Sequence, residues 1–349
     1  MPYGELTLNR TNPLIHPRWN DILLASEDYS IFHTSNWAQV LNESYRCQPY
    51  YFTLIEGDKF AVLVPVMELT SWITGTRGIC LPFSDYCYPL VDGHIPHSEV
   101  FPKIMSVARE LNWRSVEIRG GEASDGKAEP SSEFNRHILS LEAGEENIFS
   151  KMRSNYRSKV RKAVRNDLNV EICRSAESLE EYYRLHCMTR RRHGLPIQPA
   201  YFFKNIYEHI IARNLGIVVL ASHKNRYVAG SVFFHFGKKA LYKFGALDKK
   251  YQHLQPSYLV MWHAIQWYSR KGYTQLCFGR TDTDHEGLNQ FKDGWGSQRH
   301  QLNYYTFGLS RAGFVDNRQR VRRVGYRMFN KMPAPLLKIA GHLLYKHIG

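Results

Sequence analysis

Two stretches of the chain share one order of apolar and polar positions. Residues 50–69, YYFTLIEGDKFAVLVPVMEL, contain two apolar runs on either side of Gly57 and Asp58, which predicts two strands joined by a turn. An amphipathic pattern predicts a helix over roughly 99–111, and SVEIRGG at 115–121 predicts a further strand. The first half therefore reads as a hairpin, a helix and one more strand.

The second stretch repeats this order. Residues 215–237 predict two strands and a turn, and 239–247 a third strand. A helix is expected over 256–272 and a strand over 274–281. The helix-to-strand junctions, ARELNWRSVEIRGG and YSRKGYTQLCFGRT, align at an offset of 160 residues. The repeat predicts an α+β unit used twice, with mixed, mostly antiparallel sheets flanked by helices.

Composition is consistent with two domains. The chain has 349 residues, of which 43% are hydrophobic, so it can bury large cores. Its longest apolar runs, such as AVLVPV, are far shorter than the roughly 18–20 residues that span a bilayer, and the start lacks an apolar signal segment. We expect a cytoplasmic protein, with peripheral contact to the inner membrane as a further option. The six cysteines form no CxxC pair and the sixteen histidines no HExxH, so neither a disulfide frame nor a metal site is expected.

Positive charge is concentrated in two segments. The net charge is +14, and residues 151–192 carry 12 basic against 5 acidic residues, while 292–349 carry 11 against 2. Such segments attract phosphate on a nucleotide, an RNA, a lipid-linked precursor or a membrane surface. From about residue 311 the basic residues alternate with apolar ones at helical spacing, which predicts either a helix pair that contacts a membrane or partner, or a packed helix with a solvated face.

The segment KMRSNYRSKVRKAVR, residues 151–165, predicts a helix with two rows at four-residue spacing. The basic row is Arg153, Arg157, Arg161 and Arg165, and the apolar row is Met152, Tyr156, Val160 and Val164. Like charges at this spacing repel, so a bound anion would stabilise the row. A solvated helix face, a nucleic-acid contact and a phosphate-bearing substrate all remain open at this point.

Three further motifs combine residue types that chemistry uses. TRRRHGLPIQPAYF, residues 189–202, places His193 in a basic, restricted loop, and LPFSDYCYPL, residues 81–90, places Asp85 among aromatics, where it could act as a base or cap a turn. NQFKDGWG, residues 289–296, sets Lys292 beside aromatics and glycines, where it could stabilise negative charge or be an ordinary surface lysine.

Together these segments resemble the FemAB family of non-ribosomal peptidyl transferases, a branch of the GNAT acyltransferase superfamily. The matching residues run from about 32 to 305 and include FHTSNWAQVL, TGTRGICLPFSDY, NYRSKVRKAVRND, YKFGALDKKYQHLQPSYLVMW, LCFGRT and NQFKDGWG. The ending, KMPAPLLKIAGHLLYKHIG, resembles the branch associated with exopolysaccharide and exosortase gene clusters. The resemblance implies two GNAT-like domains. We expect these at 1–145 and at 146–310, the second carrying most of the site, with a basic helical tail at 311–349.

The resemblance also implies roles for individual residues. Lys292 matches a lysine implicated in catalysis, and Asp85 matches an acid near the acceptor amine. Arg157, with its neighbour Arg161, matches a contact to the phosphate of a cell-wall precursor. Tyr242 matches a tyrosine lining the same cleft, and His193 and Arg280 lie in motifs near it. We expect Lys292→Met to lower turnover with little effect on folding.

The chain departs from the family pattern at three places. Leu41 and Asn42 follow Trp37 where a basic residue can contact a second phosphate, and no coiled-coil insertion interrupts the second domain. Where an ordinary GNAT enzyme holds the CoA pyrophosphate on a glycine-rich loop, the chain has YQHLQPSYL, and its Pro256 has no amide donor.

The expected function is acyl or aminoacyl transfer to an amine of a cell-envelope or exopolysaccharide precursor, as in peptidoglycan and cell-wall biogenesis. No cofactor is expected to be bound, and the donor is aminoacyl-tRNA or acyl-CoA. The expected partners are a phosphate-bearing precursor, charged tRNA and the inner membrane surface reached by the basic C-terminus, but not DNA. Two alternatives stay open: an acyl-CoA-dependent N-acyltransferase acting on an amino sugar or small amine, and a non-catalytic RNA- or membrane-binding protein.

Overall fold

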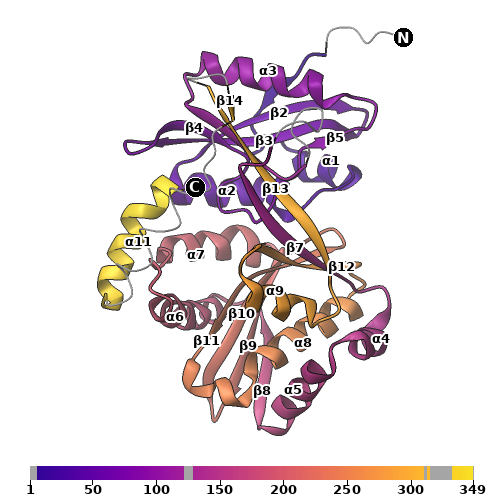
Figure 1. The fold of residues 1–349 in the computed structure, drawn as a ribbon, viewed down its shortest axis with the longest axis vertical. Helices are drawn as coiled ribbons and strands as arrows, with labels where there is room; N and C mark the ends of the chain where they lie inside the picture. Colours follow the sequence, from indigo (N-terminus) through magenta and orange to yellow (C-terminus); the bar gives the residue numbers. More distant parts are fainter. Residues whose placement is uncertain (1–5, 122–128, 310–312, 315–331, 349) are drawn as a thin grey trace. The chain divides into compact units, whose positions relative to one another are not determined.

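The computed structural model describes residues 6–121, 129–309, 313–314 and 332–348 (Figure 1). The chain divides into two compact units. Unit 1 comprises residues 1–133, 302–323 and 343–349, and unit 2 comprises residues 134–301 and 324–342. Within the described ranges, no helix is long and apolar enough to cross a membrane.

Unit 1 is built on a mixed sheet with the strand order β1-β2-β3-β4-β6-β13. All neighbours are antiparallel except β4 and β6, which are parallel over Gly78–Val116 and Ile79–Glu117. Its elements are β1 (Asn9–Thr11), α1 (Trp19–Ala25), η1 (Ile31–His33), α2 (Ser35–Tyr45), β2 (Gln48–Glu56), β3 (Lys59–Ser71), β4 (Gly75–Ile79), β5 (Leu90–Val91), α3 (His97–Glu110), β6 (Ser115–Arg119), β14 (Gly313–Phe314) and the second part of β13 (Gln298–Gly308).

Unit 2 repeats this arrangement with the strand order β7-β12-β11-β10-β9-β8. Here β11 and β12 are the parallel pair, and their neighbours are antiparallel. Its elements are β7 (Ser132–Ser140), α4 (Gly144–Lys151), α5 (Ser154–Arg165), β8 (Leu168–Cys173), α6 (Ala176–Arg192), α7 (Ala200–Ile206), the π-helix η2 (Tyr207–Ile211), β9 (Gly216–His223), β10 (Arg226–Phe236), β11 (Lys239–Leu247), η3 (Lys249–Leu254), α8 (Pro256–Arg270), β12 (Gln275–Asp282), α9 (Glu286–Asp293) and most of α11 (Ala334–Ile348).

Helices cover both faces of the unit 2 sheet, as Figure 1 shows. α8 and α5 bury one face, because their apolar residues share a core with the inward residues of β9, β10 and β11. α6 packs against the same strands from the other side, next to α7. The α+β class and the mixed, mostly antiparallel sheets predicted from the sequence are confirmed.

The internal repeat is also present. β6 begins at Ser115 and β12 at Gln275, the offset at which the sequence junctions align, and the helices that precede them end at Glu110 and Arg270. β7 and β13 each carry the chain from one unit to the other: β13 pairs with β6 in unit 1, whereas β7 pairs with β12 in unit 2. The division at residues 133 and 301 therefore differs from the expected boundaries at 145 and 310, because each unit takes one strand from beyond its own repeat.

Helix α5 differs in detail from its prediction. Arg153 precedes the helix as its N-cap, and Val164 is 62% exposed although its row was expected to be buried. Residues four apart on an α-helix advance by about 40° per step, so the row that begins on the core face has turned outward by its fourth member. Ala163 takes the buried position instead. Of the predicted C-terminal helix pair, α11 is present, and residues 315–331 lie outside the described residues.

Candidate functional site

The two parallel strands of unit 2 separate where the site residues gather. β11 and β12 pair from Lys239–Gln275 up to Leu241–Cys277, where their pairing ends. The residues that follow, Tyr242 and Phe278, still have ring centroids 6.4 Å apart. Beyond Cys277 the register of β12 with β7 shifts as well, with Gly279 in the left-handed region at φ 69°. Gly279 of β12 is therefore in register with neither neighbouring strand, so its main-chain groups form hydrogen bonds outside the sheet.

Lys292 supplies hydrogen bonds to two main-chain carbonyls at this register shift. Its side chain reaches from α9 to β12, is 2% exposed, and donates from Nζ to the carbonyl oxygens of Gly279 and Arg280 at 3.0 and 3.2 Å. A buried ammonium group costs free energy unless it is hydrogen-bonded, and these carbonyls supply that compensation. The lysine thus places a positive charge at the separation of β11 and β12. It also ties α9 to the bulge of β12. These bonds predict a larger loss of stability for Lys292→Met than the little effect on folding that was expected from the sequence.

Tyr242 faces the same opening from β11. Burial raises the pKa of its phenol to about 12, against the opposing effect of a hydrogen bond with Ser231, so the hydroxyl stays protonated at neutral pH. A Cβ on Gly245 would overlap the Tyr242 hydroxyl oxygen. Glycine at 245 therefore gives this hydroxyl its position.

Arg280 and His193 lie near this opening on different elements. Arg280 is exposed at the bulge of β12, with its guanidinium carbon 4.4 Å from the centroid of the Phe134 ring. His193 ends α6, whose Thr189 hydroxyl accepts from the Leu247 amide at the end of β11. Burial, followed by the charge of Arg192, lowers the pKa of His193. His285, which caps α9, adds to this effect, so the end of α6 lies within electrostatic reach of the start of α9.

A buried histidine lies beside Asp293, the residue that follows Lys292. His137 on β7 is fully buried, with Nε2 3.1 Å from Oδ1 of Asp293, the residue after Lys292. Burial and then the Lys292 charge lower the pKa of His137 to about 4, so the imidazole is neutral at pH 7. Sequence reasoning missed this residue, because only strand pairing brings residue 137 to α9.

An aromatic cluster joins three of the motifs singled out in the sequence. Tyr156 of α5, Tyr258 of α8, and Phe291 and Trp295 at the end of α9 have ring centroids 5.1–6.3 Å apart. The Tyr156 hydroxyl donates to the Gln290 carbonyl, which ties α5 to α9. Each of these sequence motifs contains an aromatic residue, and this shared feature could have predicted the cluster.

Lys159 lies over this cluster. Its Nζ donates to the Tyr258 hydroxyl at 2.8 Å and lies 4.6 Å from the centroid of that ring. Tyr258 belongs to the first turn of α8, the place where an ordinary GNAT enzyme binds the pyrophosphate. The basic helix α5 therefore puts a cation at this turn through Lys159, which the sequence analysis did not single out.

The two arginines of α5 that were predicted to bind phosphate contact residues of α4. Arg157 donates from Nη1 to the Ser150 carbonyl at 2.7 Å, and the Arg161 guanidinium lies 5.5 Å from the centroid of the Phe149 ring. These contacts orient both groups on the exposed side of unit 2. They do not link either arginine to Lys292 or Tyr242, so a phosphate-binding role for them stays a prediction.

Asp85 belongs to unit 1. Its main-chain carbonyl accepts from the Tyr304 hydroxyl at 2.7 Å. Arg119 fixes the same loop by donating to the carbonyls of Leu81 and Ser84 while its Nε donates to Glu117. The loop that carries Asp85 is thus held in shape within its own unit, and the role of Asp85 as a base stays a prediction.

The first turn of α8 is poorly suited to a pyrophosphate. Pro256 at its start has no amide proton, and Gln255 before it adopts the left-handed conformation. The Gln255 amide donates to the Gln252 carbonyl and the Tyr258 amide to the Gln255 carbonyl. The 3-10 helix η3 takes the place of a glycine-rich loop. These amides are engaged within the chain, whereas a bound pyrophosphate would need them.

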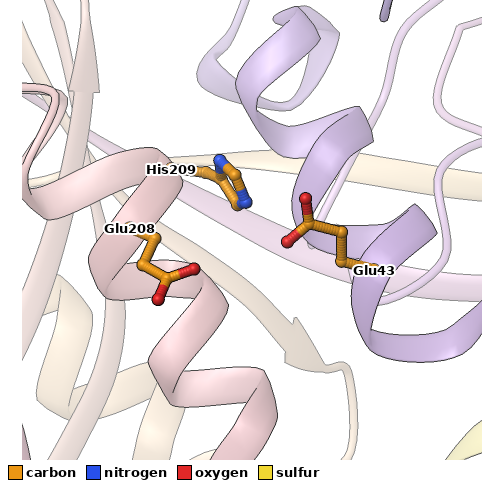
Figure 2. A group of neighbouring side chains, drawn as sticks. All are labelled: Glu43, Glu208 and His209. Carbon is orange, nitrogen blue, oxygen red and sulfur yellow. The ribbon is translucent and has the colours of Figure 1, made fainter.

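Figure 2 shows Glu43, Glu208 and His209, whose side chains are of the types that can bind a metal ion. Glu208 and His209 are consecutive residues of η2 in unit 2, whereas Glu43 lies on α2 in unit 1. Glu208 pairs with Lys204 one turn away. Because its members come from both units, we assign no metal site to this grouping.

Comparison with known families identifies the core of unit 2. Residues 150–292 match the family described as "Acetyltransferase (GNAT) domain". This range, which is less than half of the chain, is similar to GNAT acetyltransferase domains. The matched range contains α5, the separating strands β11 and β12, and the lysine of α9, so this GNAT domain includes the features described above.

Individual proteins extend this result. A lipid II:glycine glycyltransferase of Staphylococcus saprophyticus is 32% identical over 77 residues, which cover 20% of this chain and 19% of that enzyme. The chain thus matches only about a fifth of the length of that relative. The crystal structure of FemX superposes with a TM-score of 0.64 at 14% identity, covering 82% of this chain and 94% of FemX.

Two further structures show the same fold. The C-terminal domain of a putative lysylphosphatidylglycerol synthetase from Agrobacterium fabrum gives a TM-score of 0.56 at 12% identity, covering 82% of this chain and 90% of that chain. A tandem GNAT protein from the clavulanic acid biosynthesis pathway gives 0.55 at 9%, covering 85% and 95%. The predicted tandem GNAT-like fold and the FemAB-like resemblance are confirmed, whereas the narrower exosortase-associated branch stays a prediction.

Proposed function

We propose that this protein transfers an aminoacyl group from a charged tRNA to an amine of a phosphate-bearing envelope precursor. The observation that carries this proposal is the first turn of α8, where Pro256 has no amide proton and the amides of Gln255 and Tyr258 donate to carbonyls of the chain. The partial similarity to a lipid II:glycine glycyltransferase supports the same substrate class.

The reaction would take place where β11 and β12 separate. The acceptor amine attacks the ester carbonyl of the aminoacyl group and loses a proton to a base, directly or through a water. Asp85 of unit 1 stays the base that the family resemblance predicts. The resulting oxyanion is stabilised by the buried charge of Lys292 and by the Tyr242 hydroxyl, which burial keeps protonated. Collapse of the intermediate forms the amide and releases the tRNA with a free ribose hydroxyl, which takes up one proton.

The remaining predicted residues would position the substrates. Arg157 and Arg161 would bind the phosphate of the acceptor, since guanidinium groups match phosphate oxygens in geometry. Arg280 and His193 would contact the substrates at the rim of the opening. If the acceptor is linked to a lipid, the reaction would take place at a membrane surface. This location would agree with the predicted contact of the chain with the inner membrane.

A second candidate is acyl-CoA-dependent N-acylation of an amino sugar or small amine. The match to an acetyltransferase family favours it. It requires a pyrophosphate position other than the usual one, because the first turn of α8 presents few amides.

A transfer assay with a matched pair of variants tests the proposal. Purified protein is incubated with a pool of labelled aminoacyl-tRNAs and an extract of lipid-linked envelope precursors, and label in the lipid fraction is counted. Tyr242→Phe is expected to lower transfer by about 100-fold or more. Tyr273→Phe, two residues before β12 begins, is the control and should retain wild-type transfer. Equal transfer by wild type and Y242F, or incorporation from acyl-CoA alone, would overturn the proposal.

A further inference from the structure

The outer face of α11 exposes apolar and basic residues in two parallel rows. Leu336, Ile339 and Leu343 are 49%, 57% and 53% exposed. Lys338, His342 and Lys346 are exposed as well and follow each other at four-residue intervals along the helix. At 100° per residue, the apolar row occupies one edge of the outer face and the basic row the adjacent edge.

The opposite face of α11 is packed against the protein. Leu337 is fully buried, and its carbonyl accepts from the Ile197 amide at 3.1 Å. A Cβ on Gly341 would overlap the Ile197 carbonyl, so the helix approaches this segment closely because residue 341 is glycine. The contact of Leu337 and Gly341 with Ile197 therefore fixes the orientation of α11, and its apolar row faces outward.

The last turn of α11 is fastened to an exposed tryptophan within unit 1. Trp72 follows β3 and is 86% exposed, but its Nε1 donates to His347 Nε2 at 3.1 Å. His347 Nδ1 lies 3.0 Å from the Ser71 hydroxyl, and Arg77 donates to the His347 carbonyl. Exposed Ile73 comes next in the same turn. The exposed apolar surface thus continues from Leu343 on α11 to Trp72, whose ring is held by its hydrogen bond to His347.

We propose that α11, together with Trp72 and Ile73, docks the protein on an anionic lipid bilayer. An interfacial helix places its apolar row at the boundary between headgroups and acyl chains, with lysines flanking it at the headgroups. Tryptophan prefers this boundary, because its ring is apolar and its N–H is polar. Protein–protein interfaces, in contrast, are depleted of lysine, so this surface suits a bilayer better than a second protein.

The charge of the neighbouring sequence agrees with this partner. Residues 315–331 contain six Lys or Arg residues and one Asp. Anionic lipid attracts basic residues near its surface, each strengthening binding by about fivefold. The proposal goes beyond the acyl-transfer function and does not depend on it, because docking is measured without donor or acceptor.

Vesicle co-sedimentation of the full chain tests the proposal. The probes are phosphatidylcholine vesicles with and without 30 mol% phosphatidylglycerol, at low and high salt. Leu336→Gln/Ile339→Gln/Leu343→Gln is expected to lower partitioning onto the anionic vesicles by about 100-fold, since three side chains no longer enter the apolar boundary. Lys338→Gln/Lys346→Gln is expected to lower it by about 25-fold, mainly at low salt.

Controls separate docking from general effects. Ile15→Gln and Leu24→Gln alter exposed apolar residues elsewhere and should bind vesicles as the wild type does. The triple glutamine variant retains every basic residue of 315–331, so its loss of binding reports on α11. Thermal unfolding of each variant should match that of the wild type, because the substituted side chains are exposed; a variant that is less stable is replaced by Leu336→Gln alone.

Three results would overturn the proposal. The first is absence of anionic vesicle binding by the wild type, or binding that the triple variant retains. The second is a wild-type dimer in sedimentation velocity that the triple variant converts to monomer without any vesicle binding, which would assign the face to a second copy. The third is RNA binding that the lysine variant loses and the glutamine variant keeps, with no vesicle binding by the wild type.

Discussion

Replacing Lys292 with Met tests the part that the lysine plays at the separation of β11 and β12. The methionine side chain has nearly the same length but no donor, so the carbonyls of Gly279 and Arg280 both lose a hydrogen bond. A buried acceptor left without its partner costs about 1–3 kcal/mol. Because the Arg280 bond is only partly buried, we expect the variant to lose about 2–4 kcal/mol of unfolding free energy.

The assay is urea unfolding of the wild type, K292M and Lys271→Met, an exposed lysine just after α8 that serves as the control. The control should stay within about 0.5 kcal/mol of the wild type. A second readout is the NMR titration of His137, whose pKa the Lys292 charge helps to hold near 4. In K292M that pKa should rise.

Transfer activity is then compared at a temperature at which K292M remains folded. Lower transfer there would report the electrostatic role of the ammonium group separately from its structural role. An unchanged unfolding midpoint together with an unchanged His137 titration would refute the hydrogen-bonding role derived for Lys292.

Three further predictions concern other parts of the fold. Gly245→Ala should displace the Tyr242 hydroxyl and lower transfer nearly as much as Y242F, with little change in melting temperature; wild-type kcat would contradict this. Arg119→Met should lower unfolding free energy by about 3–5 kcal/mol in urea, because it leaves Glu117 and two carbonyls without their partner; a loss under 1 kcal/mol would show that these bonds matter little. Stability should also fall between pH 7.5 and pH 5, because three histidines are buried and neutral. Burial lowers the pKa of His137 and His235 to about 4 and that of His186 to about 3, so the unfolded chain takes up protons first and each histidine costs about 2 kcal/mol at pH 5. Equal urea midpoints at both pH values would contradict this effect.

The sequence pattern was sufficient for the elements of each repeat. Alternation of apolar residues along a strand and their 3.6-residue period along a helix are local properties, so β6 and β12 were found at matching positions. The pairing of β7 with β12 and of β13 with β6 could not be predicted from such local patterns. Whether β13 pairs with β6 or with a strand of its own repeat depends on contacts between residues almost 200 positions apart.

The site was only partly predictable for a related reason. Tyr242, Arg280 and Lys292 were named from motifs, and the structure places all three at the separation of β11 and β12. That Lys292 donates to main-chain carbonyls follows from a register shift in β12, which side-chain patterns do not show. Lys159 was hidden among seven basic residues of one segment, and only the packing of α5 on α8 distinguishes it from the others.

Donor identity is the most direct test of the proposed function. Purified protein is mixed separately with labelled charged tRNA, with the same tRNA after deacylation, and with labelled acyl-CoA, and retention on filters is measured at two salt concentrations. We predict saturable retention of charged tRNA that weakens on deacylation, with no saturable retention of acyl-CoA. Saturable binding of acyl-CoA without binding of charged tRNA would contradict aminoacyl transfer and show that the first turn of α8 does not exclude CoA.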